Sequence, residues 1–221
     1  MTTRVLWRAG CAETCTSGSV SGPGRRTVGN DGNALRSDFY VVMCRNQAQA
    51  EAALVKARDI LAELGLELHP DKTKVVDLRE GAGGFDFLGC HFRARMSGRL
   101  WEQRGIRRYY LHRWPSQRSM KRARARIRAL TRRNRIHQDI REVIGLLNPI
   151  LRGWGNYFRT GNAARKFNQL DEYVWRRLRR LLVNRYGRNL HAGRADAWTR
   201  EWFEEHGLHR LRGTVRYPGA A

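Results

Sequence analysis

The sequence predicts an α+β fold, in which short antiparallel strands with one helix precede an all-helical, three-helix bundle. Two observations predict it. Residues 38–111 alternate short β-branched and aromatic runs with glycine-rich turns, as strands do. Beyond Pro115 the chain is strongly basic, and its apolar residues recur every three or four positions, the period of amphipathic helices. We therefore expect three parts, residues 1–34, 35–114 and 115–221.

The net charge of the chain limits the classes of partner that we expect. It has 221 residues, of which 43 are Lys or Arg and 20 are Asp or Glu, and its formal net charge is +23. Such an excess favours a polyanion, with nucleic acid as the leading partner and an anionic membrane surface as the lesser alternative. No apolar run approaches the length of a transmembrane helix and no signal peptide is evident, so we expect no membrane insertion and a cytoplasmic location.

The cysteines do not predict a metal centre. Cys11 and Cys15 lie close together, but no further pair at zinc-ligand spacing follows them. Cys44 and Cys90 lie in apolar runs and are expected to be small buried side chains. We therefore predict no bound metal and no cofactor.

The N-terminal segment differs in composition from the rest of the chain. Residues 1–34 are rich in Gly, Ser and Thr and lack a sustained period, so we expect them to be disordered or loosely attached. Residues 38–44, DFYVVMC, are typical of a buried strand. Residues 47–64 repeat apolar positions on one side of a helix, which Gly65 can close in a left-handed conformation.

The next segment reads as strands. Residues 66–78 predict two short strands on either side of a turn. FDFLGCHF, residues 85–92, predicts one further strand around Gly89. The β-rich segment is expected to continue as a hairpin through Trp101 to Leu111.

This order of strand, helix, strand pair and FLG strand resembles the C-terminal half of a reverse transcriptase palm. In those enzymes a Tyr-Ala-Asp-Asp turn precedes the first strand, and its carboxylates hold two magnesium ions. Aligned on VVMC, Asp38 stands in place of the second Asp, whereas Ser37 stands in place of the first. Because serine cannot replace an ionised carboxylate as a magnesium ligand, we expect Asp38 to be an inactive remnant. Magnesium would be needed only if polymerase activity were retained.

Two more short matches belong to the palm. Lys72 resembles the lysine that lies near the phosphates of the incoming nucleotide. Phe87, Leu88 and Gly89 resemble the primer grip, where backbone and aromatic groups steady the end of the primer. Since the metal site is incomplete, we interpret Lys72 as a solvated turn residue and the FLG residues as packing and close-approach positions.

Residues 116–133 predict a strongly basic helix that Ser116 can cap. A narrow apolar stripe runs from Met120 to Leu130, and the remaining faces carry eight Lys and Arg residues with no acid between them. Like charges on one helix repel each other unless a polyanion is near, which favours RNA contact over a passive solvated face.

Two more helices complete the predicted bundle. The first, residues 139–158, begins with Asp139 near its positive end, and Pro149 should break or kink it. The second, residues 163–186, has an apolar stripe with arginines on the other faces.

The run LLNPILRGWGNYFRTGNAARKFNQLDEYVWRRLRRLL, residues 146–182, closely resembles the maturase-specific, or X/thumb, domain of group II intron-encoded proteins. The resemblance extends from Asp38 to the C-terminus and implies a rear palm and thumb, shortened at the N-terminal side. It implies binding of structured intron RNA to assist splicing. DNA and a separately made N-terminal reverse transcriptase part are further partners that it implies.

The expected basis of RNA binding is phosphate contact by arginines together with base stacking by exposed aromatic rings. Trp154 lies between two glycines and is equally a candidate for the core. We assign RNA contact to Lys121, Arg122, Arg126, Arg133, Arg152, Trp154, Tyr157, Arg159, Arg176, Arg177 and Arg180.

Two alternatives remain open at the level of the sequence. The chain could be an RNA-directed DNA polymerase that is active only with a separate N-terminal piece, which primer extension would reveal. It could also be a product without function, for which the altered metal motif and the unrelated N-terminal segment argue.

Overall fold

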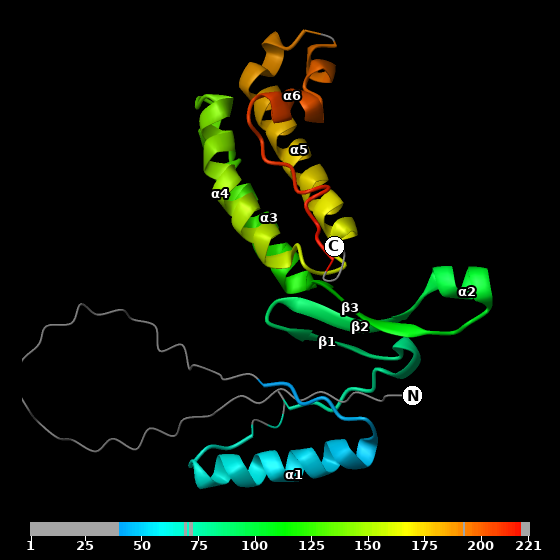
Figure 1. Ribbon diagram of the computed structural model, residues 1–221. Helices are drawn as coiled ribbons and strands as arrows, with labels where there is room; N and C mark the ends of the chain where they lie inside the picture. Colours follow the sequence, from blue (N-terminus) through cyan, green and yellow to red (C-terminus); the bar gives the residue numbers. More distant parts are fainter. Residues whose placement is uncertain (1–39, 69, 71–72, 192, 218–221) are drawn as a thin grey trace, which may run out of the picture. The chain divides into compact units, whose positions relative to one another are not determined.

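The computed structural model describes residues 40–217 except 69, 71, 72 and 192. The chain divides into two compact units, Met1–Gly84 and Phe85–Ala221. The described residues form one three-stranded antiparallel sheet and six α-helices, so the predicted α+β class is confirmed (Figure 1). The segment 1–34, for which we expect disorder or loose attachment, lies outside the described residues.

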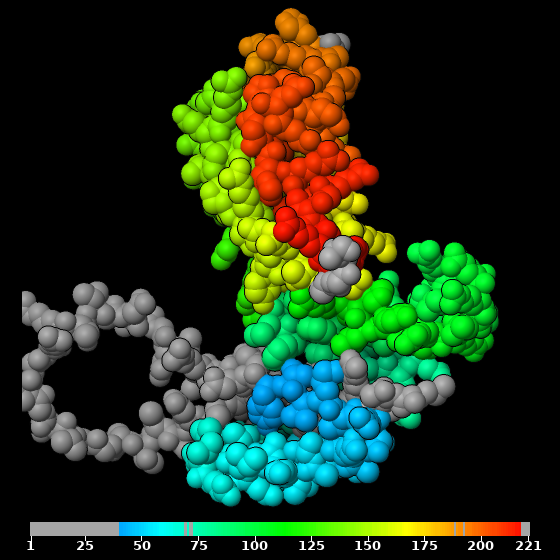
Figure 2. Space-filling view, in the orientation of Figure 1, coloured from blue at the N-terminus to red at the C-terminus, as the bar shows by residue number. Residues whose placement is uncertain are grey.

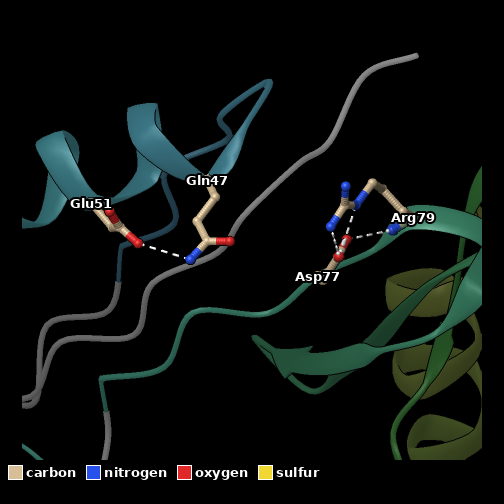
Figure 3. A network of polar contacts seen from close by, with 4 residues as sticks. All are labelled: Gln47, Glu51, Asp77 and Arg79. Carbon is tan, nitrogen blue, oxygen red and sulfur yellow. Dashed lines mark hydrogen bonds and ion pairs between the residues drawn. The ribbon is translucent and has the colours of Figure 1, made fainter.

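The helix of the first unit forms where the sequence predicts it. Helix α1 spans Gln47–Glu63, and the side chain of Asn46 accepts a hydrogen bond of 2.8 Å from the backbone N–H of Gln49. One turn into the helix, the Gln47 amide donates to Glu51 at 2.9 Å (Figure 3). Gly65 follows with φ +69°, the left-handed conformation expected at the end of a helix.

The prediction of strands in the first unit is wrong. Residues 40–44, 66–68 and 73–78 have no strand pairing in the described part of the chain. A β-branched run becomes a strand only where another strand satisfies its backbone groups. Instead, the Asp77 carboxylate accepts hydrogen bonds from the backbone and guanidinium of Arg79, which begins a short 3₁₀ turn (Figure 3).

In the second unit the FLG segment is a hairpin and not the single strand that we expected. Strand β1 is Gly84–Phe87 and strand β2 is Cys90–Met96. Leu88 and Gly89 separate them with φ of 45° and 75°, because a two-residue hairpin turn favours left-handed backbone at both positions. Strand β3, Tyr109–Pro115, pairs antiparallel with β2, so the sheet order is β1-β2-β3.

The connection between β2 and β3 is also different from the plain hairpin that we predicted. It contains helix α2, Gly98–Arg104, which places Trp101 on a helix. The Ser97 hydroxyl accepts from Leu100 N at the start of α2, and Gly105 ends it with φ +63°. Local capping at both ends therefore outweighs the strand preference of the intervening residues.

The three helices of the predicted bundle are confirmed as α3, Gln117–Leu130, α4, Ile140–Phe158, and α5, Ala164–Tyr186 (Figure 1). Ser116 caps α3 as expected, and Asp139, which we expected as an acid at the positive end of α4, caps that helix through its side chain. Their apolar stripes meet in one core, and the largest fully buried side chains in it are Phe167, Phe203, Met120, Ile127 and Ile144.

Pro149 does not break α4, which runs through it without interruption. Proline removes only one intrahelical donor, and the freed carbonyl belongs to Gly145, an exposed residue that water can reach. The burial of Leu147 and Leu151, on either side of the proline, holds this part of the helix against the core.

The C-terminal segment packs along the bundle. It contains helix α6, Arg200–Glu205, and an irregular stretch that lies against α4 (Figure 2). Asn148 donates to the carbonyl of Gly207 and accepts from the N–H of His209. The side chain of Leu211 is fully buried and lies over Gly155, where an added Cβ would approach its Cδ2 to 2.6 Å.

Candidate nucleic-acid interface

Helix α3 presents a basic surface that its own core contacts hold in place. Met120, Ala123 and Ile127 are buried on one side. The side chains of the cations on the other side are exposed. Within the part of the chain that the structure describes, none of them has a carboxylate partner. We call these residues the α3 basic face: Arg118, Lys121, Arg122, Arg126 and Arg128.

The predicted RNA contacts beyond α3 are less uniform. Arg133 is exposed in a short 3₁₀ turn that follows α3, and Arg152 is exposed on α4. Arg159 is half-buried at the end of α4, where its carbonyl accepts a 2.7 Å hydrogen bond from the backbone of Arg216.

The three arginines predicted on α5 have three different surroundings. Arg180 is exposed, and no carboxylate is paired with it among the described residues. Arg176 pairs with Glu172 one turn earlier at 2.7 Å. The guanidinium of Arg177 donates to the hydroxyl of Thr131 at 2.9 Å and to its carbonyl at 2.5 Å. Arg177 therefore joins α5 to the end of α3, and that contact competes with any phosphate.

The two aromatic candidates for base stacking also have different surroundings. Trp154 is half-buried, and its ring lies 4.8 Å from that of Phe158 and 5.4 Å from that of Phe167, measured between centroids. Trp154 therefore fits the alternative expectation, in which it packs against the core. Tyr157 is 57% exposed, and its hydroxyl donates to the carbonyl of Leu88 at 2.8 Å.

The turn between β1 and β2 docks onto the bundle. The carbonyl of Gly89 accepts from Ser116 N at 2.9 Å and from the Ser119 hydroxyl at 2.7 Å. Phe87 is half-buried and Leu88 is exposed, with its carbonyl bound to Tyr157. These residues, which resemble a primer grip, thus fasten the sheet to α3 and α4, in keeping with close approach.

The candidate metal and nucleotide residues of the palm are not placed. Asp38 and Lys72 lie outside the described residues, so their assignments stay predictions. Among the residues that are described, no group of three or more His, Cys, Asp or Glu side chains is arranged to hold a metal ion. Cys44 is buried as expected, whereas Cys90 is half-buried and its burial raises the pKa of its thiol.

Asp171 has a role that the sequence did not reveal. Its neighbour Glu172 pairs with Arg176 within α5, as acids and arginines one helical turn apart commonly do. Asp171 instead accepts the backbone N–H groups of Leu211 and Arg212, at 3.1 and 2.8 Å, and so anchors the C-terminal segment to α5. Burial raises the pKa of its carboxyl above the usual aspartate range. A partner 40 residues away leaves no local signal.

A groove of about 330 Å³ lies beside this anchor, between α5 and the C-terminal segment. Two of its acidic residues have basic partners. Glu172 pairs with Arg200 as well as with Arg176, and Glu204 pairs with Arg210 at 3.3 Å. These ion pairs and the Asp171 anchor hold the C-terminal segment against α5.

None of the helices in the described residues is both long and apolar enough to cross a membrane.

The comparison with known protein families gives one match. The family model for the group II intron maturase-specific domain matches residues 120–202, from the first turn of α3 into α6. No curated protein matches the chain. Residues 120–202 thus match the group II intron maturase-specific domain, which confirms the resemblance of this chain to the C-terminal portion of a group II intron maturase.

Proposed function

We propose that this chain binds structured group II intron RNA and assists splicing by holding the folded RNA. The observation that carries the proposal is the α3 basic face, whose cations are exposed and have no carboxylate partner among the described residues. All of its residues except Arg118 lie inside the segment matched by the maturase-specific family.

The electrostatics of α3 favour a polyanionic partner. Arg118, Arg122 and Arg126 follow each other at intervals of four residues, so their side chains are neighbours on one helical face. Like charges at this spacing destabilise an isolated helix by a few tenths of a kcal/mol per pair. Phosphate groups relieve that repulsion and release counterions, which is the main source of affinity in nucleic-acid binding.

The packing of the bundle supports recognition of a folded RNA. The buried stripe of α3 and the contact of Arg177 with Thr131 fix the orientation of the basic face relative to α5. A rigid array of cations matches a particular arrangement of phosphates, whereas a flexible array would bind any polyanion equally well.

The test is equilibrium binding of the full chain to a folded group II intron RNA and to a scrambled RNA of equal length, at two salt concentrations. The variant Arg122→Gln/Arg126→Gln should weaken binding and lower the slope of log affinity against log salt by about 0.7–0.9 per lost phosphate contact. The matched control is Lys56→Gln/Arg58→Gln, which removes two exposed cations from α1 and should leave the affinity for the intron unchanged.

Preference for the intron that persists at high salt supports the proposal, and a splicing assay with the same variants then measures assistance directly. Equal, salt-labile binding of both RNAs, with the two double variants equally impaired, contradicts it. That result would leave only a general affinity of a basic chain for polyanions.

A further inference from the structure

The connection between β2 and β3 forms a second basic and aromatic surface, separate from the α3 basic face. We call residues 95–110 the hairpin tip. Backbone hydrogen bonds hold its conformation: Ser97 N donates to the carbonyl of Arg108 at 2.8 Å, and Gly105 N donates to that of Trp101 at 2.9 Å. Antiparallel pairing of Met96 with Tyr109 continues the sheet into it. The tip is thus a locally ordered element.

The side chains of this ordered element are uncovered. Every residue from 101 to 110 is exposed, including Trp101 at 42%, Tyr110 at 44% and Ile106 at 50%. Single exposed apolar residues are common, but several large ones gathered on one short element mark an interaction surface. No core requirement explains these side chains, since none of them belongs to the buried cluster of the bundle.

The charge of the tip indicates the class of partner. Residues 95–110 contain five arginines and a single acid, Glu102. The guanidinium of Arg107 lies 5.1 Å from the ring centroid of Trp101, and that of Arg108 lies 5.6 Å from that of Tyr110. An arginine beside each ring brings together a stacking surface and a phosphate-binding group.

Strand pairing places a further arginine on the hairpin. Arg95 is the direct cross-strand partner of Tyr110, so their side chains share one face of the hairpin. The guanidinium of Arg95 lies 4.9 Å from the ring centroid of Trp114, whereas that of Arg108 lies beside Tyr110. Arg108 is therefore the cation next to the Tyr110 ring, and Arg95 adds positive charge to the neighbouring strand.

We infer that the hairpin tip binds an unpaired, single-stranded segment of RNA, with bases stacked on Trp101 and Tyr110 and phosphates held by the adjacent arginines. Bases inside a duplex have no free face for an aromatic side chain, whereas unpaired bases in loops and ends do. The inference rests on the proposed function for the identity of the nucleic acid, but it concerns residues outside α3 and outside the matched family segment.

The test compares two RNAs that share one stem and differ only in a 3′ extension of about ten unpaired nucleotides. The full chain with Trp101→Ala/Tyr110→Ala should lose about tenfold in affinity for the extended RNA, while binding of the blunt stem stays unchanged. Trp101→Phe/Tyr110→Phe, which keeps both rings, should bind the extended RNA as the unchanged protein does. Tyr217→Ala removes an aromatic side chain that is 51% exposed outside the tip and serves as the matched control.

A second readout locates the contact. Photo-crosslinking of the extended RNA, with 4-thiouridine in the extension, should label the peptide that carries Trp101 or Tyr110. Far-UV circular dichroism of the variants should match that of the unchanged chain, since all the altered side chains are exposed.

Several results would overturn the inference. The first is equal affinity of Trp101→Ala/Tyr110→Ala and the unchanged chain for the extended RNA. The second is tighter binding of a DNA extension than of the RNA extension, and the third is dimerisation that this variant abolishes. If Arg122→Gln/Arg126→Gln weakens binding of both RNAs while the tip variant changes neither, the tip inference fails and the proposed function stands. If the chain binds neither RNA, both fail.

Discussion

Helices α1 and α4 are of similar length, yet they bury very different amounts of side chain. Of the 17 residues in α1 only Ala50 is buried, whereas seven of the 19 residues in α4 are buried. Both helices begin with a capping side chain and both carry apolar residues. The sequences already indicate part of this difference, because α4 is more apolar than α1 and its apolar residues are gathered more strongly on one side. The surroundings of each helix decide the rest.

The same contrast holds between the two units. In Phe85–Ala221 the helical stripes converge on one core. In the described part of the first unit the buried cluster contains only Cys44 and Ala50. Val55 on α1 and Leu64 directly after it remain 55% and 67% exposed. Local signals suffice to form a helix, but stability requires that its apolar face meet another element.

The largest effect should come from a core position of the second unit. Phe167→Ala removes a fully buried ring and should lower the free energy of unfolding by about 3–5 kcal/mol. Leu64→Ala, at the exposed end of α1, should change it by less than about 0.5 kcal/mol. Urea unfolding followed by tryptophan fluorescence reports chiefly on the second unit, where six of the seven tryptophans lie, and far-UV circular dichroism reports on the helices of both units. Equal effects of the two substitutions would contradict the contrast between the units.

The turn that pairs β1 with β2 should be the next most sensitive. Gly89→Ala places a side chain at φ +75° and brings its Cβ to 2.8 Å from the Ser119 hydroxyl, which binds the Gly89 carbonyl. We expect a loss of about 2–3 kcal/mol, of which about 1–2 is left-handed strain and the rest is the hydrogen bond. Gly105→Ala has φ +63° and no neighbour within 4 Å, so it should show the strain alone in the same urea titration.

A smaller effect should distinguish the two glycines that flank Trp154. Gly155→Ala would approach Leu211 Cδ2 to 2.6 Å, and Leu211 is fully buried, so we expect a loss of about 1–2 kcal/mol. Gly153→Ala meets nothing within 4 Å in the middle of α4 and should stabilise the protein by about 0.5–1 kcal/mol. Thermal unfolding of both variants checks this; a lower melting temperature for Gly153→Ala than for Gly155→Ala would refute it.

The smallest expected effect is a difference in pH dependence between the units. Burial raises the pKa of Asp171, so the folded state resists its ionisation, and stability falls as pH rises from the usual aspartate pKa through the raised one. The hydrogen bonds from Arg79 lower the pKa of Asp77, so its contribution is present above the usual value and is lost as pH falls.

Stability measured from acidic to neutral pH for Asp171→Asn and Asp77→Asn tests both signs. With rising pH, the unchanged chain should lose stability relative to Asp171→Asn and gain it relative to Asp77→Asn. Parallel curves for the unchanged chain and Asp171→Asn would show that Asp171 ionises in the folded state as easily as in the unfolded state.

Most of the basic bundle could be predicted from the sequence. The caps Ser116 and Asp139, the apolar stripes and the charge of α3 are local features, because each depends on residues within one or two helical turns. The resemblance carried by residues 146–182 falls within the matched segment, residues 120–202. It too depends only on the order of residues along the chain.

Whether a predicted arginine remains available for RNA depends on residues that are distant in the sequence. Arg177 is held by Thr131 across 46 positions, while Arg180, three residues later, is exposed. Likewise, β2 and β3 pair with each other although neither contains a β-branched residue, whereas the run with two valines at residues 40–44 has no strand partner among the described residues. Strand formation depends on a partner that the run itself does not specify.

The sequence by itself determined the helices of the bundle, the Ser116 cap of α3, the positive charge and the family match of residues 120–202. Only the tertiary structure decided that α4 continues through Pro149, that Trp154 packs against the core, and that the hairpin tip presents its aromatic rings to solvent. The physical reason is range. Helix periodicity and capping act over a few residues, whereas burial and hydrogen-bond pairing depend on segments brought together by the whole fold.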